Sequence, residues 1–209
     1  RALDAALAAA GVARCGGARV EAIEPLSGRF RVVTASGAVE AERIVLAAGL
    51  DTARLAPMVG LAVPLVANKG HVIALGRVAP MLPLPLETLR QTDEGIVLVG
   101  DSHEDRDDDA LDPAVIGAIA RRALRILPAL ASARVIRTWA GSRVMTPDGL
   151  PLYDASRTHP GAFAVACHSG VTLAAAHAFM LGPAIADGRL PDALAPFGAK
   201  RFDHVRAAA

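Results

Sequence analysis

The sequence is poor in aromatic residues and in cysteine. Phe, Trp and Tyr together make up 3% of the 209 residues, and Cys15 and Cys167 are the only cysteines and form no CxxC pair. Two isolated cysteines exclude a disulfide-rich fold and suit a reducing compartment, so we expect a cytoplasmic protein. No apolar run reaches the roughly 20 residues that span a bilayer, because charged residues, glycines and prolines interrupt every run. We therefore expect no transmembrane segment.

An excess of charge of either sign is also lacking. The 22 basic and 21 acidic residues give a formal net charge of +1, which provides no electrostatic reason to expect a nucleic acid or an anionic membrane as partner. A small molecule is the better expectation. The hydrophobic content of 53% is enough for a large core, and the length suits one or two compact domains.

A GxGxxG phosphate loop, the usual sign of a dinucleotide site, does not occur either. In such a loop, glycines between a strand and a helix let backbone amides hold a pyrophosphate. The stretch GVARCGG, residues 11–17, has the wrong spacing and does not follow a strand. We interpret it as an ordinary turn.

The first third of the chain predicts a helix followed by a β-meander. Residues 1–10 have a helical pattern that Gly11 ends, and residues 18–48 contain three strands joined by short turns. The last of these strands contains IVLAA, which is apolar throughout and is expected to be covered on both faces. Asp51 and Thr52 are expected to cap the short helix that follows.

The remainder predicts an antiparallel sheet, a helix and a return to α/β structure. Irregular strands between residues 63 and 100 favour an antiparallel sheet. A helix is predicted to begin with Asp112 as its N-cap and Pro113 in its first turn. Residues 161–167 are predicted to form a buried strand, followed by a long apolar helix over 171–188. The predicted class is therefore mixed, α/β at the ends and antiparallel in the middle.

The acidic run DSHEDRDDDALD raises the question of a metal site. Asp105, Asp107 and Asp109 alternate like the first ligands of a calcium loop. The sixth position of such a loop should be glycine and is Ala110, and no glutamate closes the loop. A solvated loop that leads into the next helix is the better interpretation, and we expect no metal.

Two nucleophile hypotheses arise in VACHSGV, residues 165–171. Cys167 and His168 are adjacent on a strand and therefore point to opposite faces, which makes a thiol–imidazole pair geometrically poor. Ser169 between a strand and a helix resembles a nucleophile elbow, but that elbow needs glycines where Cys167 and Val171 stand. Ser169, followed in the chain by Asp187 or Asp192 and then by His204, would give the Ser, Asp, His order of a hydrolase triad. A serine hydrolase therefore stays open as an alternative.

A third interpretation of this stretch is a ligand site made of backbone amides. A helix that begins here would leave the N–H groups of Ser169, Gly170, Val171 and Thr172 unpaired, at the positive end of its dipole. Such donors suit an anion or an electron-rich ring oxygen, such as those at the edge of a reduced flavin.

Four stretches in this order, ARVEAI, RIVLAAG, TWAGSRVMTPDGLPLYDAS and PGAFAVACHSGVTLAAAHA, resemble the FAD-dependent amino acid oxidase (DAO) family, which includes glycine oxidase, sarcosine oxidase and D-amino acid dehydrogenase. The resemblance covers nearly the whole chain but only the C-terminal portion of such an enzyme. It implies a Rossmann-like FAD-binding domain in two parts, 1–63 and 141–209, interrupted by an antiparallel substrate-binding domain, 64–140. The N-terminal unit with the phosphate loop has no counterpart here. We therefore expect a truncation, or a subunit whose partner chain supplies that loop.

The resemblance also implies roles for individual residues. Val20 corresponds to a backbone contact with adenine, and Ala48 and Gly49 correspond to a close approach of the strand end to FAD. Arg143 corresponds to the arginine that binds the substrate carboxylate, with a structural ion pair as the alternative. The pyrimidine edge of the flavin would be covered by His168, Ser169, Gly170, Val171, Thr172 and Leu173. His71 stands where relatives often have glutamine, and we expect a hydrogen-bonded strand histidine there.

The expected function is therefore that of a FAD-dependent oxidoreductase. It would oxidise the C–N bond of an amino acid or secondary amine by hydride transfer to the flavin. The alternatives are a noncatalytic fragment or subunit that needs a partner to bind FAD, and the serine hydrolase. Without a phosphate loop, the isolated chain is expected to be inactive.

Overall fold

The computed structural model describes residues 2–203, which divide into two compact units. Unit 1 contains the described parts of residues 1–63, 152–165 and 172–209, and unit 2 contains residues 64–151 and 166–171. The functional division expected from the sequence, with bounds near residues 63 and 140, stays a prediction. Within the described residues, no helix is long and apolar enough to cross a membrane.

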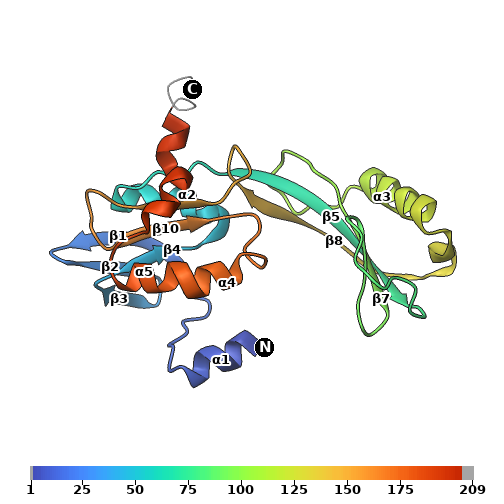
Figure 1. The fold of residues 1–209 in the computed structure, drawn as a ribbon, viewed down its shortest axis with the longest axis horizontal. Helices are drawn as coiled ribbons and strands as arrows, with labels where there is room; N and C mark the ends of the chain where they lie inside the picture. Colours follow the sequence, from blue (N-terminus) through green and yellow to red (C-terminus); the bar gives the residue numbers. More distant parts are fainter. Residues whose placement is uncertain (1, 204–209) are drawn as a thin grey trace. The chain divides into compact units, whose positions relative to one another are not determined.

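Unit 1 combines two small sheets with short helices (Figure 1). Its strands are β1 (Val20–Leu26), β2 (Arg29–Thr34), β3 (Gly37–Ala41), β4 (Ile44–Leu46), β9 (Leu152–Ala155) and β10 (Ala162–Ala166). Its α-helices are α1 (Ala2–Ala9), α2 (Thr52–Leu55), α4 (Ala174–Ala176) and α5 (Gly182–Ala186). Its remaining helical turns are η1 (Gly49–Asp51), η2 (Ala56–Val59), η4 (His177–Leu181), η5 (Asp192–Phe197) and η6 (Ala199–Phe202).

The meander predicted for residues 18–48 is present, but its third strand is divided between two sheets. Strands β1, β2 and β3 form an antiparallel sheet in that order, whereas β4 pairs in parallel with β10 in a sheet ordered β4-β10-β9. The expectation that IVLAA is covered on both faces is wrong. Ile44 and Leu46 are buried, but Val45 is 44% exposed. The physical reason is that β4 is an edge strand of this sheet in the described part of the chain.

The long apolar helix predicted for residues 171–188 is also different in the structure. Helical structure begins only at Ala174, and α4 passes after three residues into the π-helical turn η4 before α5 restores α-helical bonding. Leu173 precedes α4 without a side-chain cap. The predicted end is confirmed, since Gly188 has a φ of +84°, a conformation that favours glycine.

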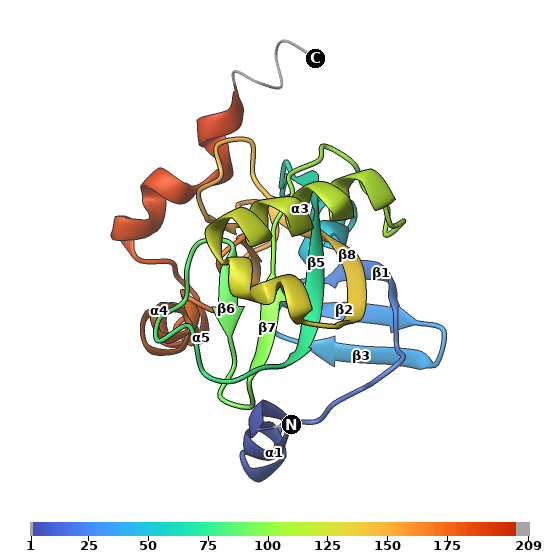
Figure 2. The same cartoon turned by 90° about the vertical axis from the view of Figure 1, so that its right-hand side faces the viewer.

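Unit 2 is an antiparallel sheet covered by one helix. Its elements are β5 (Val66–Arg77), β6 (Leu89–Gln91), β7 (Ile96–Val99), α3 (Pro113–Ile126), η3 (Pro128–Ser132) and β8 (Val135–Met145). The sheet has the order β6-β7-β5-β8, and Figure 2 shows α3 lying across it. Ile119 and Ala123 of α3 pack with Ile73, Leu89 and Val97 of the sheet in one buried cluster.

The predicted start of α3 is confirmed in detail. Oδ1 of Asp112 accepts hydrogen bonds from the backbone amides of Ala114 at 2.8 Å and Val115 at 3.4 Å, and Pro113 is the first helical residue. A carboxylate acceptor satisfies amides that have no partner in the first turn, and proline has no amide to satisfy.

Candidate functional site

Arg143 lies on β8 in unit 2, opposite Asn68 of β5. Its Nη1 donates to Oδ1 of Asn68 at 3.0 Å and to the carbonyl of Ser102 at 2.9 Å, and its Nη2 donates to Oδ2 of Asp101 at 3.3 Å. The side chain is 19% exposed. The guanidinium is therefore held by three protein groups, and about a fifth of the side chain as a whole stays accessible.

Asp101, which contacts Arg143, also contacts other basic side chains. Oδ2 of Asp101 lies 3.3 Å from Nη2 of Arg143. Oδ1 of Asp101 lies 3.8 Å from Nη2 of Arg122, which belongs to α3. Nε2 of His103 lies 3.1 Å from Oδ2 of the same carboxylate, so Asp101 is shared among three basic side chains. The ion pair with Asp101 is the structural alternative that the sequence left open, and it does not use up the hydrogen-bonding capacity of Arg143, because a guanidinium has five N–H donors.

The acidic run of residues 101–112 is fixed along β5. The amide of Lys69 donates to the carbonyl of Glu104 at 2.8 Å, and the amide of Glu104 returns a bond of 3.0 Å to Lys69. The Lys69 side chain is 1% exposed, and its Nζ lies 2.5 Å from Oδ1 of Asp108. This hydrogen bond from the ammonium lowers the pKa of Asp108. In the described part of the chain, no group of three or more His, Cys, Asp or Glu side chains could hold a metal ion.

His71 is fully buried on β5, and both of its ring nitrogens are hydrogen bonded. Its Nε2 accepts a hydrogen bond of 3.1 Å from the backbone amide of Asp112. Its Nδ1 lies 3.1 Å from Oγ of Ser102 and 2.9 Å from Oε1 of Glu104. Because Nε2 accepts a hydrogen bond, we infer that Nδ1 carries the proton. This is the hydrogen-bonded strand histidine expected from the sequence.

Ala48 and Gly49 of unit 1 are the second and third residues after β4. The amide of Ala48 donates to Oγ1 of Thr52 at 3.0 Å, and Gly49 has a φ of +63°, in the left-handed region that favours glycine. In parallel α/β sheets, ligands bind outside the carboxyl ends of the strands. The role of these two residues in a close approach to FAD stays a prediction, and the conformation of Gly49 is compatible with it.

Val20 begins β1, and its carbonyl already accepts a hydrogen bond. Nη2 of Arg54 donates to this carbonyl at 2.8 Å and to Oδ2 of Asp51 at 2.9 Å. The hydrogen bond from Arg54 lowers the pKa of Asp51. Asp51 is thus engaged by an arginine and makes no side-chain cap for α2, contrary to expectation. Adenine could use only the second lone pair of the Val20 carbonyl.

The residues expected to cover the flavin lie in a turn before α4, and not in its first turn. His168, Ser169, Gly170 and Val171 belong to unit 2, and Thr172 and Leu173 belong to unit 1. The expectation that a helix begins at Val171 is wrong by three residues. Yet, within residues 2–203, none of the backbone hydrogen bonds formed outside helices and strands has an amide of Ser169 to Thr172 as its donor. Val171 is 94% exposed.

These features fit the isoalloxazine part of FAD, each within its own unit. Gly49, at the start of η1 after β4, offers a backbone without a side chain, and residues 169–172, which are exposed, offer consecutive backbone amides of the kind that stabilise negative charge. Val20 fits adenine less well, because of Arg54. The 209 residues contain no GxGxxG loop for the pyrophosphate.

The nucleophile alternatives gain little from the geometry. Burial raises the pKa of the Cys167 thiol, which disfavours the reactive thiolate. Ser169 contacts its neighbour His168, with 3.2 Å between Oγ and Nδ1. In the described part of the chain no carboxylate orients His168, and His204, the histidine proposed for the triad, lies outside the described residues.

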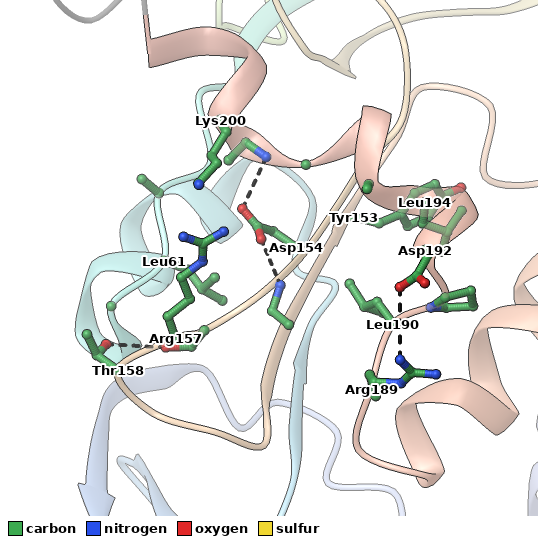
Figure 3. A pocket seen from close by; sticks show the side chains of 18 of the residues that line it. Leu61, Tyr153, Asp154, Arg157, Thr158, Arg189, Leu190, Asp192, Leu194 and Lys200 are labelled. Atoms are coloured by element: carbon green, nitrogen blue, oxygen red, sulfur yellow. Dashed lines mark hydrogen bonds and ion pairs between the residues drawn. The ribbon is translucent and has the colours of Figure 1, made fainter.

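A cavity of about 700 Å³ lies in unit 1, and none of the ten predicted site residues lines it. Figure 3 shows the charged ends of Arg157 and Lys200 directed toward the region of Asp154. Asp154 is itself bound by the amides of Ala155 at 2.9 Å and Ala199 at 3.1 Å. The charged lining residues are Arg157, Arg189, Lys200, Asp154, Asp192 and Asp203. Three basic and three acidic side chains give the cavity no preference for a ligand of either charge.

Sequence reasoning missed the residues that hold Arg143. Asn68, Asp101 and Ser102 lie 75, 42 and 41 positions away in the chain. Asp101 begins the acidic run, which was considered only as a metal site or a solvated loop. The alternation of β5 and β8 would have placed Asn68 opposite Arg143 only if the register had been known.

Comparisons with known proteins identify the family of the chain. The family described as FAD dependent oxidoreductase (DAO) matches residues 1–182. The chain is 48% identical over 184 residues to a subunit of opine oxidase from Agrobacterium tumefaciens (strain Ach5), a match that covers 88% of this chain and 50% of that protein. It is 45% identical over 203 residues to the corresponding opine oxidase subunit of Rhizobium meliloti, with coverage of 97% and 55%.

The fold is similar to the crystal structure of glycine oxidase from Geobacillus kaustophilus, with a TM-score of 0.86, 25% identity, and coverage of 94% of this chain and 55% of that one. The chain thus spans about half the length of the curated relatives it matches. The predicted mixed α/β fold and the predicted family are both confirmed: the chain belongs to the DAO family of FAD-dependent oxidoreductases.

Proposed function

We propose that the enzyme containing this chain oxidises the C–N bond of an amino acid or secondary amine, with Arg143 binding the substrate carboxylate. The observation that carries this proposal is the state of the Arg143 side chain. It is fixed by three partners, it is 19% exposed, and the carboxylate that it contacts is shared with Arg122. A fixed guanidinium with free donors suits bidentate binding of a carboxylate.

The names of the relatives support a proposal for the substrate class. Two of them are named as subunits of an opine oxidase, and a more distant one bears the name glycine oxidase. An opine is a secondary amine derived from an amino acid and carries at least one carboxylate. We propose an opine or a related amino acid as substrate, because both have a carboxylate next to a C–N bond.

The residues that would hold FAD are Gly49 and the turn of residues 169–172. When bound, FAD supplies the acceptor for the hydride that leaves the substrate carbon. The amides of the turn would hydrogen bond the electron-rich pyrimidine edge of the ring. Arg143 would fix the substrate by its carboxylate, so that the C–H bond keeps one orientation. A neutral amine needs no general base for this reaction.

A second candidate is a subunit that binds FAD only with a partner. The observation in its favour is that the 209 residues contain no GxGxxG loop. Two relatives are named as one subunit of a larger oxidase, which is consistent with a partner chain. Flavin absorbance of the purified chain, alone and together with the products of neighbouring genes, distinguishes this candidate from a chain that holds FAD by itself.

Replacement of Arg143 tests the carboxylate role. In the complete enzyme, Arg143→Lys keeps the charge and loses the planar fork. A charged hydrogen bond contributes about 1.5 to 3 kcal/mol, so kcat/KM should fall on the order of tenfold to a hundredfold. The flavin spectrum should not change. Unchanged kinetics on octopine, glycine and L-proline, if any of them is oxidised by the parent enzyme, would remove the carboxylate role.

A further inference from the structure

Gly70 of β5 lies directly beneath the guanidinium of Arg143. Gly70 is buried and pairs with Gly141 of β8, two positions along the ladder from the pair of Asn68 and Arg143. A Cβ atom placed on Gly70 would lie 2.5 Å from Nη1 and 2.6 Å from Cζ of Arg143. Real Cβ atoms essentially never approach another heavy atom so closely.

The backbone does not explain the glycine at this position. The φ of Gly70 is not among the positive values that other glycines adopt, so alanine would fit the local strand conformation. A glycine inside a strand costs stability relative to residues with a side chain. The feature that requires a missing side chain is the guanidinium that crosses the strand.

We propose that Gly70 is a positioning residue for the substrate carboxylate. Without a side chain at residue 70, the Arg143 guanidinium can lie across β5 and reach Asn68 and Ser102 with Nη1 and Asp101 with Nη2. Three of its five N–H donors are used in this way, and Nε–H has no partner among the described residues. This inference rests on the proposed function, in which the remaining donors bind the substrate.

A side chain at residue 70 would displace Arg143 and leave the sheet in place. The guanidinium is the end of a flexible side chain, whereas the atoms around it belong to the paired strands β5 and β8. Hydrogen bonds weaken steeply as distance and angle depart from their optimum. A methyl group at residue 70 would therefore release the guanidinium from its partners and turn a fixed binding group into a mobile one.

The experiment compares Gly70→Ala with Gly76→Ala in the complete, FAD-loaded enzyme. Gly76 lies on the same strand, is outside the left-handed region, and a Cβ there would meet the carbonyl of Arg134 at an ordinary 3.5 Å. The probes are octopine, glycine and L-proline, together with pyrrolidine, which is L-proline without its carboxylate. The measurements are KM, kcat, flavin absorbance and melting temperature.

Gly70→Ala should raise KM for the acids on the order of tenfold, because fixed charged hydrogen bonds to the carboxylate are lost. The kcat at saturation and the flavin spectrum should change little, any activity on pyrrolidine should be unaffected, and Gly76→Ala should match the parent enzyme. In an Arg143→Lys background, Gly70→Ala should have no further effect on KM, since the guanidinium is no longer there.

The outcomes separate the inference from the proposed function. If Arg143→Lys raises KM and Gly70→Ala does not, the positioning role is wrong and the carboxylate role stands. If neither changes KM, the carboxylate role itself is wrong. An equal effect of Gly70→Ala in the parent and Arg143→Lys backgrounds also overturns the inference. Should Gly70→Ala lower the melting temperature of the parent, it must cause no further loss in an Arg143→Ala background, and an equal loss there contradicts the proposed contact.

Discussion

The N-cap of α3 allows a quantitative test of how unit 2 is built. Asp112→Ala removes the acceptor for the amides of Ala114 and Val115, and loss of such a cap costs about 0.5 to 2 kcal/mol. The backbone amide of Asp112 would still donate to His71, so the buried network around that histidine is kept. We expect the free energy of unfolding of unit 2 to fall by about 1 kcal/mol.

Asp112→Asn is the matched control. Asparagine keeps the acceptor and loses only the attraction between the carboxylate and the helix dipole, which contributes about 0.3 to 1 kcal/mol. The assay is urea unfolding followed by the fluorescence of Trp139, because this sole tryptophan lies on β8 and reports on unit 2. The expected order of stability is Asp112, then Asn, then Ala. If Asn and Ala destabilise equally, the side-chain hydrogen bonds do not stabilise the start of the helix.

Three further predictions concern the cofactor and pH. The isolated 209-residue chain should purify with little flavin, because it has no GxGxxG loop; stoichiometric FAD absorbance would contradict this. In the complete enzyme, Gly170→Val should release flavin and leave the melting temperature of the flavin-free form unchanged, because the nearest atom to a Cβ there is Sγ of Cys167 at 3.7 Å; Ser169→Ala should retain flavin and activity, whereas a serine hydrolase would lose its activity. The pKa of Asp108 is lowered by Lys69, so its contribution to stability is present above the unfolded pKa of about 3.9 and is lost as the pH falls through the lower folded value. Asp108→Asn should therefore reduce stability near neutral pH and converge with the parent in acid, and a constant difference would contradict the pairing.

Features set by neighbouring residues could be predicted from the sequence. The start of α3 depends on Asp112 and Pro113, which act on amides within three residues. The end of the C-terminal helical segment depends on Gly188, whose φ of +84° suits glycine. In both cases the chemistry that decides the structure lies within one turn of the residue that was identified.

Features set by distant segments could not be predicted. The partner of β4 is β10, more than 100 positions later, and no pattern in IVLAA shows that it leaves the meander sheet to pair there. The exposure of Val45 follows from that pairing. The start at Ala174 was missed because an Ala-rich run favours helix throughout, so its periodicity does not reveal where the preceding turn ends.

The two roles considered for Arg143 are compatible, and the geometry explains why. Asp101 is shared between Arg143 and Arg122, so its charge orients Arg143 without being paired to it alone. A carboxylate that binds to Arg143 must also lie near Asp101, which repels it, and net charge alone therefore contributes little to its affinity. Fixed, directional donors must contribute most of it. This is why lysine, which keeps the charge and not the fork, is expected to fail at this position, and why a glycine two residues from Asn68 has a role in binding a substrate that it does not contact.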